Sequence, residues 1–319
     1  MATFQEHTTM SKTLLFAILF TTSQMVFGQK FLSRIDSLNS KEDVETLIHS
    51  FDKDYQKFKL KPISEFESDD NTKGFCKKIA DSLYIKKSFY RADFDNNGFT
   101  DLLTIGDYYD FKIFVVMNYG HDSLKLNRLT RRSFQEYTFP KILNDTLIRY
   151  YFMQEPNWND KDQSATLQYK DLTFKYGDFV EYNSKPKSYS IEKIEYQTTM
   201  CYGSCPKFHI SILRDKSSIF IAEAYNREFR NNKEIEGEFN TTLSDNSFSE
   251  IINLLNYIDF PNLKDNYAVG WTDDQTCTLT IRYNNGQVKT IRDYGLIGTY
   301  GLVKLYQMLF DLRFNQNWK

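Results

Sequence analysis

The sequence lacks the short motifs that mark the common classes of enzyme. It contains no Gly-x-Ser-x-Gly nucleophile elbow, no P-loop and no His-Glu-x-x-His zinc-hydrolase pattern. Histidine, the side chain best suited to proton transfer near neutral pH, occurs only four times. We find no catalytic constellation of residues, and we therefore favour a protein that is not an enzyme.

A strong charge of either sign is also missing. Lys and Arg together number 40 and Asp and Glu number 42, which gives a net charge of −2. Proteins that bind nucleic acid or anionic membranes electrostatically carry a basic excess or patch, so we expect no nucleic-acid partner, and the partner is unknown. Aromatic residues make up 16% of the chain, which favours β-rich cores and leaves a sugar-stacking surface as an alternative.

Long apolar runs are absent except near the N-terminus, where residues 13–20 read TLLFAILF. This run is too short to span a bilayer as a helix. It follows a short basic segment that begins at Met10, and the residues before Gln29 suit cleavage by a signal peptidase. The pattern predicts a signal peptide at residues 1–28 with Met10 as the start, and an N-terminal core helix is the alternative.

A cysteine that could carry a lipid anchor is missing from the predicted cleavage site. Gln29 stands there, and the first cysteine is Cys76. We therefore expect an exported protein, periplasmic or extracellular, that is not lipid-anchored and does not span the membrane in its mature form. An oxidising compartment allows cysteines to pair. The sequence does not choose among the three full pairings of Cys76, Cys201, Cys205 and Cys277.

The residues after the predicted signal, about 290 of them, suggest two domains. We place the boundary in the polar segment 183–188, which contains a proline and has no apolar period. Residues 29–185 have the pattern of a helix, capped by Ser40, followed by strands. Residues 190–319 have the pattern of two strands, a helix, two strands and a final helix. The expected fold class is α+β, with two domains that each contain a mainly antiparallel β-sheet and one or two packed helices.

The second domain carries the clearer local signals. Residues 191–198 are rich in β-forming side chains, and Ser244 or Ser247 is suited to cap a helix. Asn284-Asn285-Gly286 between two apolar segments predicts a hairpin. Leucines at helical spacing predict a final helix over residues 300–314.

A cysteine turn follows the first of these strands and reads Cys201-Tyr202-Gly203-Ser204-Cys205-Pro206. Together with Phe208 it resembles a bacterial family known as domain of unknown function 6438, whose pattern is Cys-aromatic-Gly-x-Cys-Pro between two strands. Asp273, the hairpin at Gly286 and the closing helix follow in the family's order. The resemblance covers about residues 190–319. It implies the fold and export, and no reaction is assigned to the family.

Three interpretations of the cysteine turn are open. A disulfide between Cys201 and Cys205 would fix the turn, with a stabilisation of about 2 kcal/mol for so short a loop. A redox-active pair is the second, although the alternating segment after Pro206 predicts a strand and not the helix N-terminus that lowers thiol pKa values. The third is a metal site that includes His209, for which no fourth ligand is evident. Pairing of either cysteine with Cys277 also remains open.

An acidic loop in the first domain is the second chemical signal. Residues 93–101 read DFDNNGFTD, with oxygen-bearing side chains at alternate positions and glycine at the sixth, as in calcium-binding loops. The loop resembles the calcium loops of integrin-type propeller repeats, and only one copy is present. Calcium is the one cofactor that the sequence suggests, bound weakly, and an ion-free turn is the alternative. The predicted ligands are Asp93, Asp95, Asn97, Phe99 and Asp101.

A glycine-rich segment at residues 295–301 precedes the last predicted helix. Such a segment can hold an anion at a helix N-terminus, but it has no lysine, and a plain loop is the favoured interpretation. Taken together, the sequence predicts an exported, non-enzymatic binding or structural module of the cell envelope. The alternative is an envelope enzyme or thiol-redox protein that uses Cys201 and Cys205.

Overall fold

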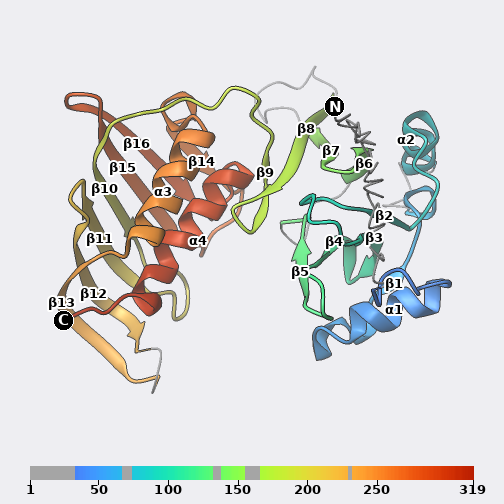
Figure 1. The fold of residues 1–319 in the computed structure, drawn as a ribbon, viewed down its shortest axis with the longest axis horizontal. Helices are drawn as coiled ribbons and strands as arrows, with labels where there is room; N and C mark the ends of the chain where they lie inside the picture. Colours follow the sequence, from blue (N-terminus) through green and yellow to red (C-terminus); the bar gives the residue numbers. More distant parts are fainter. Residues whose placement is uncertain (1–32, 67–73, 132–137, 155–165, 229–231) are drawn as a thin grey trace, which may run out of the picture. The chain divides into compact units, whose positions relative to one another are not determined.

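The computed structural model describes residues 33–66, 74–131, 138–154, 166–228 and 232–319. The predicted signal peptide lies outside the described residues. Within them the fold is α+β, and its sheets are almost entirely antiparallel (Figure 1). The fold class predicted from the sequence is confirmed.

The first half of the chain contains two sheets where the sequence predicted one. The first sheet has the order β1-β3-β4-β5, with β2 also paired to β3, and the second is the four-stranded meander β6-β7-β8-β9. Two short helices accompany these sheets, α1 (Lys41–His49) and α2 (Phe75–Leu83). The strands are β1 (Lys59–Leu60), β2 (Phe89–Ala92), β3 (Asp101–Tyr108), β4 (Asp110–Asn118), β5 (Leu124–Arg128), β6 (Thr138–Asn144), β7 (Leu147–Gln154), β8 (Thr166–Lys175) and β9 (Asp178–Glu181).

Helix α1 begins where the sequence predicts and ends earlier. Ser40 accepts from the N–H of Asp43, and the Asp43 carboxylate accepts from the N–H of Ser40, so a reciprocal capping box is present. Apolar residues recur at helical spacing from Val44 to Phe58 and predict a longer helix. The α-helix stops at His49, because Asp52 accepts from the N–H of Asp54 and starts a separate 3₁₀ turn.

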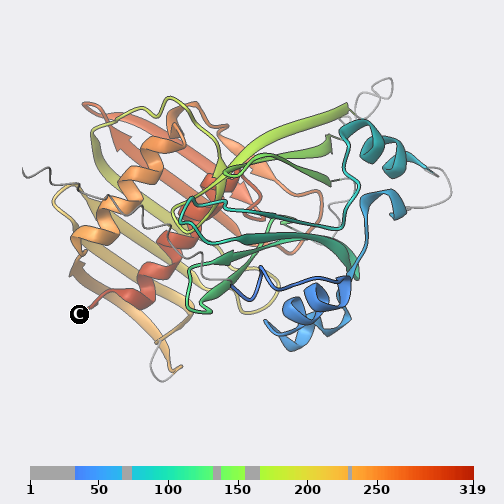
Figure 2. The ribbon, with the colours of Figure 1, turned by 45° about the vertical axis from the view of Figure 1, so that its right-hand side comes forward.

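The second half folds as one seven-stranded sheet with the order β13-β12-β11-β10-β15-β16-β14, in which only β14 and β16 are parallel. Helices α3 (Asp245–Tyr257) and α4 (Tyr300–Asn315) lie on one face of it (Figures 1 and 2). The strands are β10 (Ile191–Thr198), β11 (Lys207–Leu213), β12 (Ser217–Arg227), β13 (Glu234–Thr242), β14 (Asn266–Ala268), β15 (Thr276–Tyr283) and β16 (Gln287–Tyr294).

The core between this sheet and its two helices follows the alternation of the strands. Tyr196, Phe208 and Leu279 point inward with α4 residues such as Leu305, and all four are fully buried. The alternate residues of the same strands, including Lys193, Glu195 and Lys207, form ion pairs on the opposite face. One face of the sheet is therefore apolar and the other polar, as expected for an antiparallel sheet covered on one side.

The segments on either side of the predicted domain boundary share core residues. Val180 of β9 is buried within the core of the second half, whereas Tyr300 of α4 packs against a core cluster of the first half. Each half thus contributes a side chain to the packing of the other. The boundary at residues 183–188 remains a prediction.

Candidate functional site

Residues 199–206 connect β10 to β11 and form a tight turn, which we call the disulfide corner. Beneath it, the buried hydroxyl of Thr198 donates to the carbonyl of Pro206 at 2.8 Å. The side-chain amide of Gln275 donates to the carbonyls of Thr199 and Pro206, both at 2.8 Å. Because these bonds satisfy backbone groups under the turn, they fix its base against the sheet.

A disulfide joins Cys201 to Cys205, whose Cα atoms are 5.5 Å apart. Gly203 between them has φ 133°, a conformation that a residue with a Cβ rarely adopts. The geometry agrees with the structural interpretation of the cysteine turn. It does not assemble the metal site considered with His209, because the two sulfurs bond each other, and His209 Nε2 lies 3.8 Å from a carboxylate oxygen of Glu195.

The redox interpretation also lacks its usual structural support. The residues after Cys205 enter strand β11, as the alternating pattern predicted, and no helix begins there. A helix N-terminus is what lowers the pKa of the attacking thiol in Cys-x-x-Cys oxidoreductases. The corner therefore has no such device for stabilising a thiolate.

The two remaining cysteines are both buried. Cys277 lies on β15, fully buried near the rings of Tyr196 and Tyr306, and burial raises the pKa of its thiol to about 12. Cys76 is buried on α2. Neither joins the corner, so the alternative pairing with Cys277 is not the one present in the structure.

The corner exposes large side chains to solvent. Tyr202 is 88% exposed and Met200 is 53% exposed. The adjoining loop 269–275 carries Trp271, which is 43% exposed and donates its indole N–H to Asp274 at 2.7 Å. The two loops are joined by a hydrogen bond from the N–H of Tyr202 to the carbonyl of Asp273 at 3.1 Å. One exposed aromatic ring is therefore held on a covalently closed turn, and a second lies on the loop that is hydrogen-bonded to it.

The acidic loop lies between β2 and β3, and three of its carboxylates converge. Oxygens of Asp93, Asp95 and Asp101 lie within 4.8 Å of one another. Asp93 accepts from the N–H groups of Asn97 and Gly98 at 3.0 and 2.8 Å, which closes the turn. The structure thus brings together three of the five predicted ligands.

The other two predicted ligands take part in the loop's own hydrogen bonds. The Asn97 side chain accepts from the N–H of Phe99 at 2.8 Å, and its amide donates to Asp95 at 3.0 Å and to the carbonyl of Asn118 at 2.8 Å. These bonds are those of an Asx-type turn. They hold the loop in the shape that the structure shows.

Asp101 is the most unusual of the three acids, because it is fully buried at the start of β3. Its two carboxylate oxygens accept from the N–H groups of Phe94 and Asn118, each at 2.7 Å. Burial raises the pKa of Asp101 to about 7, although the two N–H groups oppose the shift, and burial also raises the pKa of Asp95. Charging these groups is therefore unfavourable without a nearby cation.

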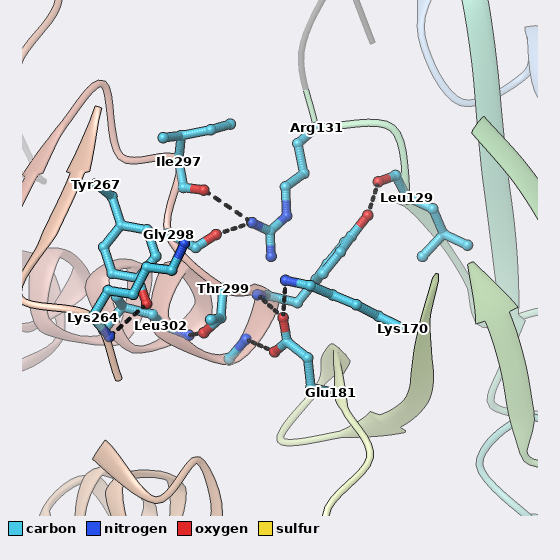
Figure 3. Close-up of polar contacts among 12 residues, drawn as sticks. Leu129, Arg131, Lys170, Glu181, Lys264, Tyr267, Ile297, Gly298, Thr299 and Leu302 are labelled. Atoms are coloured by element: carbon cyan, nitrogen blue, oxygen red, sulfur yellow. Dashed lines mark hydrogen bonds and ion pairs between the residues drawn. The ribbon is translucent and has the colours of Figure 1, made fainter. Parts of the chain in front are cut away.

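The glycine-rich segment before α4 does bind an anion, and that anion is a side chain of the protein (Figure 3). The carboxylate of Glu181, at the end of β9, accepts from the N–H groups of Tyr300 and Gly301 at 2.7 and 2.9 Å. Thr299 caps the same helix by accepting from the N–H of Leu302 at 3.1 Å. The site that a free anion would need is thus occupied within the chain.

Two glycines of this segment are explained by close packing. A Cβ on Gly298 would lie 2.8 Å from the Asp293 carboxylate, which accepts from the N–H groups of Ile297 and Gly298. A Cβ on Gly301 would lie 2.4 Å from a methyl group of Ile258. The glycines therefore permit close packing, and the plain-loop interpretation agrees with the structure better than a phosphate site.

Arg131 and Lys170 complete the contacts around Glu181 (Figure 3). The guanidinium of Arg131 stacks on the ring of Tyr300, 3.5 Å from its centroid, and donates to the carbonyls of Ile297 and Gly298. Lys170 lies 3.4 Å from Glu181. Sequence reasoning missed these residues, because more than 100 positions separate Glu181 from the helix that it caps and no local pattern marks them.

The second half of the chain thus has an α+β fold in which two helices cover one face of a mainly antiparallel sheet, and a disulfide closes the turn between its β10 and β11 strands. Residues 192–313 match the family described as Domain of unknown function (DUF6438), which confirms the resemblance found in the sequence. No curated protein and no solved structure matches the chain significantly. Among the described helices, none is both long and apolar enough to cross a bilayer.

Proposed function

We propose that the protein is exported and acts as a non-enzymatic binding module of the cell envelope, with the disulfide corner as its binding surface. The observation that carries the proposal is Tyr202, which is 88% exposed on a turn closed by the Cys201–Cys205 disulfide. Exposed tyrosine and tryptophan are the side chains most often found at the energetic centres of interfaces. A fixed turn loses little conformational entropy when a partner binds.

Export is supported by the same disulfide. Stable disulfides belong to oxidising compartments such as the periplasm and the extracellular space, which is where the predicted signal peptide at residues 1–28 would direct the chain. The competing function is a thiol-redox protein, which would use the same two cysteines without needing exposed aromatic side chains beside them.

Photo-cross-linking tests the binding surface. A photoreactive amino acid in place of Tyr202 is expected to give discrete cross-linked products in cells, because this position contacts the partner. The matched control is the same replacement at Tyr84, which is 77% exposed at the end of α2. Equal cross-linking at the two positions would show that the disulfide corner is not the binding surface. A mature chain that begins at a residue other than Gln29 would contradict the predicted cleavage site.

We further propose that the acidic loop binds calcium weakly. Three convergent carboxylates offer the hard oxygen ligands that calcium prefers, and Asn97 and Phe99 can add a side-chain and a backbone oxygen after small rearrangements. The raised pKa values of the half-buried Asp95 and the buried Asp101 support the proposal, because a bound cation would offset the cost of charging them.

Calcium at about 5 mM is expected to raise Tm by about 2–4 °C over chelator. With a dissociation constant of roughly 10⁻⁴–10⁻³ M, binding adds about 1–2 kcal/mol to the free energy of unfolding. Asp95→Asn is expected to abolish the shift. Asp122→Asn, in an exposed turn that asparagine tolerates, is the control and is expected to keep it. If calcium does not change the Tm of the wild-type chain, the loop is an ion-free turn.

A further inference from the structure

An open pocket of about 430 Å³ lies beside the disulfide corner. Its size falls within the range of small-molecule sites. The corner, the end of β12 and helix α4 all contribute to its lining, which includes Ser204, Pro206, Tyr225, Arg227, Phe310 and Arg313.

Arg313 is the unusual residue of this pocket, because it is a charged side chain that is only 8% exposed. Its Nε donates to the carbonyl of Phe310 at 3.1 Å, and its Nη1 donates to Oδ1 of Asn226 at 3.0 Å. Within the described part of the chain, its Nη2 has no hydrogen-bond acceptor and no carboxylate lies within ion-pair distance. Burial lowers the pKa of Arg313 to about 10, although the nearby Tyr196 and Asp311 oppose the shift.

The surrounding structure holds this guanidinium in one orientation. Its plane is packed among aromatic rings, 3.7 Å from the centroid of Phe310 and 4.6 Å from those of Phe208 and Phe314. Asn226, which accepts from it, is itself buried and donates to the carbonyls of Lys207 and Ala224.

A β-bulge in β12 determines the position of Asn226. The pairing of β12 with β13 shifts register between Ala222 and Asn226, and Tyr225 within the bulge has φ 55°. Bulges of this kind redirect side chains and are common beside functional sites. The strand therefore departs from regular geometry at the point where it supports Arg313.

The charge of the lining favours a single negative charge on the ligand. Two arginines, Arg227 and Arg313, and one acid, Glu228, line the pocket, so its formal charge is +1. Arg227 is exposed and contacts Oδ1 of Asn232 at 3.4 Å. A guanidinium fork matches a planar carboxylate, and the rings of Phe310 and Tyr225 offer contact for an apolar group next to it.

We propose that this pocket binds the carboxylate of an amphipathic monoanion. The carboxylate accepts from Nη2 of Arg313 and from Arg227, and the apolar part of the ligand lies on the aromatic lining. The inference rests on the proposed function, since it names the ligand class of the same corner. The observation on which it depends is a buried guanidinium that lines the pocket and forms no ion pair within the described part of the chain.

Benzoate is the probe for a titration of the full chain followed by guanidinium NMR signals. Benzoate is expected to saturate a shift of the Arg313 Nε–H signal at millimolar concentration, whereas neutral benzamide and sodium chloride of equal ionic strength leave it unchanged. Arg227→Gln, at an exposed position, is expected to weaken binding about threefold. Arg313→Gln is expected to weaken benzoate binding at least tenfold, as measured through the NMR signals of the remaining pocket residues. Arg282→Gln, on the far side of β15, is the control and is expected to leave benzoate binding unchanged.

Equal benzoate affinity in wild type and both pocket variants would overturn the inference, as would a response reproduced by sodium chloride. Tighter binding of inorganic phosphate than of benzoate would overturn the carboxylate assignment. If benzoate does not bind while position 202 still cross-links specifically, this inference fails and the proposed function stands. If Arg313-dependent binding occurs without specific cross-links at position 202, the proposed interface fails and the pocket stands.

Discussion

Glu181→Ala is expected to lower the free energy of unfolding by about 2–4 kcal/mol, the largest stability effect that we predict. The substitution removes the acceptor for two N–H groups at the start of α4. It also leaves Lys170 and Arg131 without the carboxylate that they face. The side chain is 27% exposed, so water offsets part of the loss. Urea unfolding followed by circular dichroism measures the change.

The pH dependence of this contribution has a definite sign. Burial raises the pKa of Glu181, but Lys170, Arg131 and the two N–H groups outweigh burial, and the pKa lies below its ordinary value. A lowered pKa stabilises the fold above the pKa of the unfolded chain, and the benefit disappears as pH falls through the folded value. The stability difference between wild type and Glu181→Gln is therefore expected to shrink below about pH 4.

Glu236→Ala is the matched control, because Glu236 is exposed on β13. Its free energy of unfolding is expected to stay within about 0.5 kcal/mol of wild type. A Glu181→Ala variant that unfolds at the same urea concentration as Glu236→Ala would show that the carboxylate does not stabilise the start of α4.

Replacing Cys201 and Cys205 together with serine is expected to lower the free energy of unfolding by about 2 kcal/mol. The cross-link closes a short loop, so the entropy that it removes from the unfolded chain is modest. The hydrogen bonds of Thr198 and Gln275 under the turn remain, so the sheet is expected to survive. Thermal unfolding with and without a thiol reductant measures the effect.

The reductant provides the internal control for this variant. It is expected to destabilise the wild type by the same amount and to leave the double variant unchanged, since Cys277 is buried and its pKa is raised. A reductant effect of equal size in both chains would mean that the stabilising bond lies elsewhere.

The parts of the fold that the sequence predicts well are those with local causes. Asn284, Asn285 and Gly286 all adopt positive φ, as a tight hairpin between β15 and β16 requires. Ser244 caps α3, so the first of the two candidate caps is correct. The last helix is predicted because its leucines repeat with the helical period. It occupies Tyr300–Asn315, one residue longer than predicted.

Elements with weaker local patterns escape prediction. Strand β13 alternates mostly exposed polar residues, and it forms because it pairs with β12, where Phe239 stacks on Phe220. Helix α2 begins after Gly74 without a side-chain cap. Such elements depend on tertiary partners, which a single sequence does not reveal.

The candidate sites also differ in how far apart in the sequence their residues lie. The Cys201–Cys205 bond and the convergent acids follow from residues within nine positions of one another, so short motifs are sufficient to find them. The pocket at Arg313 needs Asn226, 87 positions earlier in the chain, and a β-bulge that no composition signal marks.

The reduction potential of the Cys201–Cys205 disulfide, measured in the full chain against a thiol–disulfide buffer, tests the central claim most directly. A structural bond that supports a binding surface is expected to have a potential below about −300 mV and to resist thioredoxin. A potential near −200 mV, with ready reduction by thioredoxin, would contradict the account and establish the corner as a redox-active site.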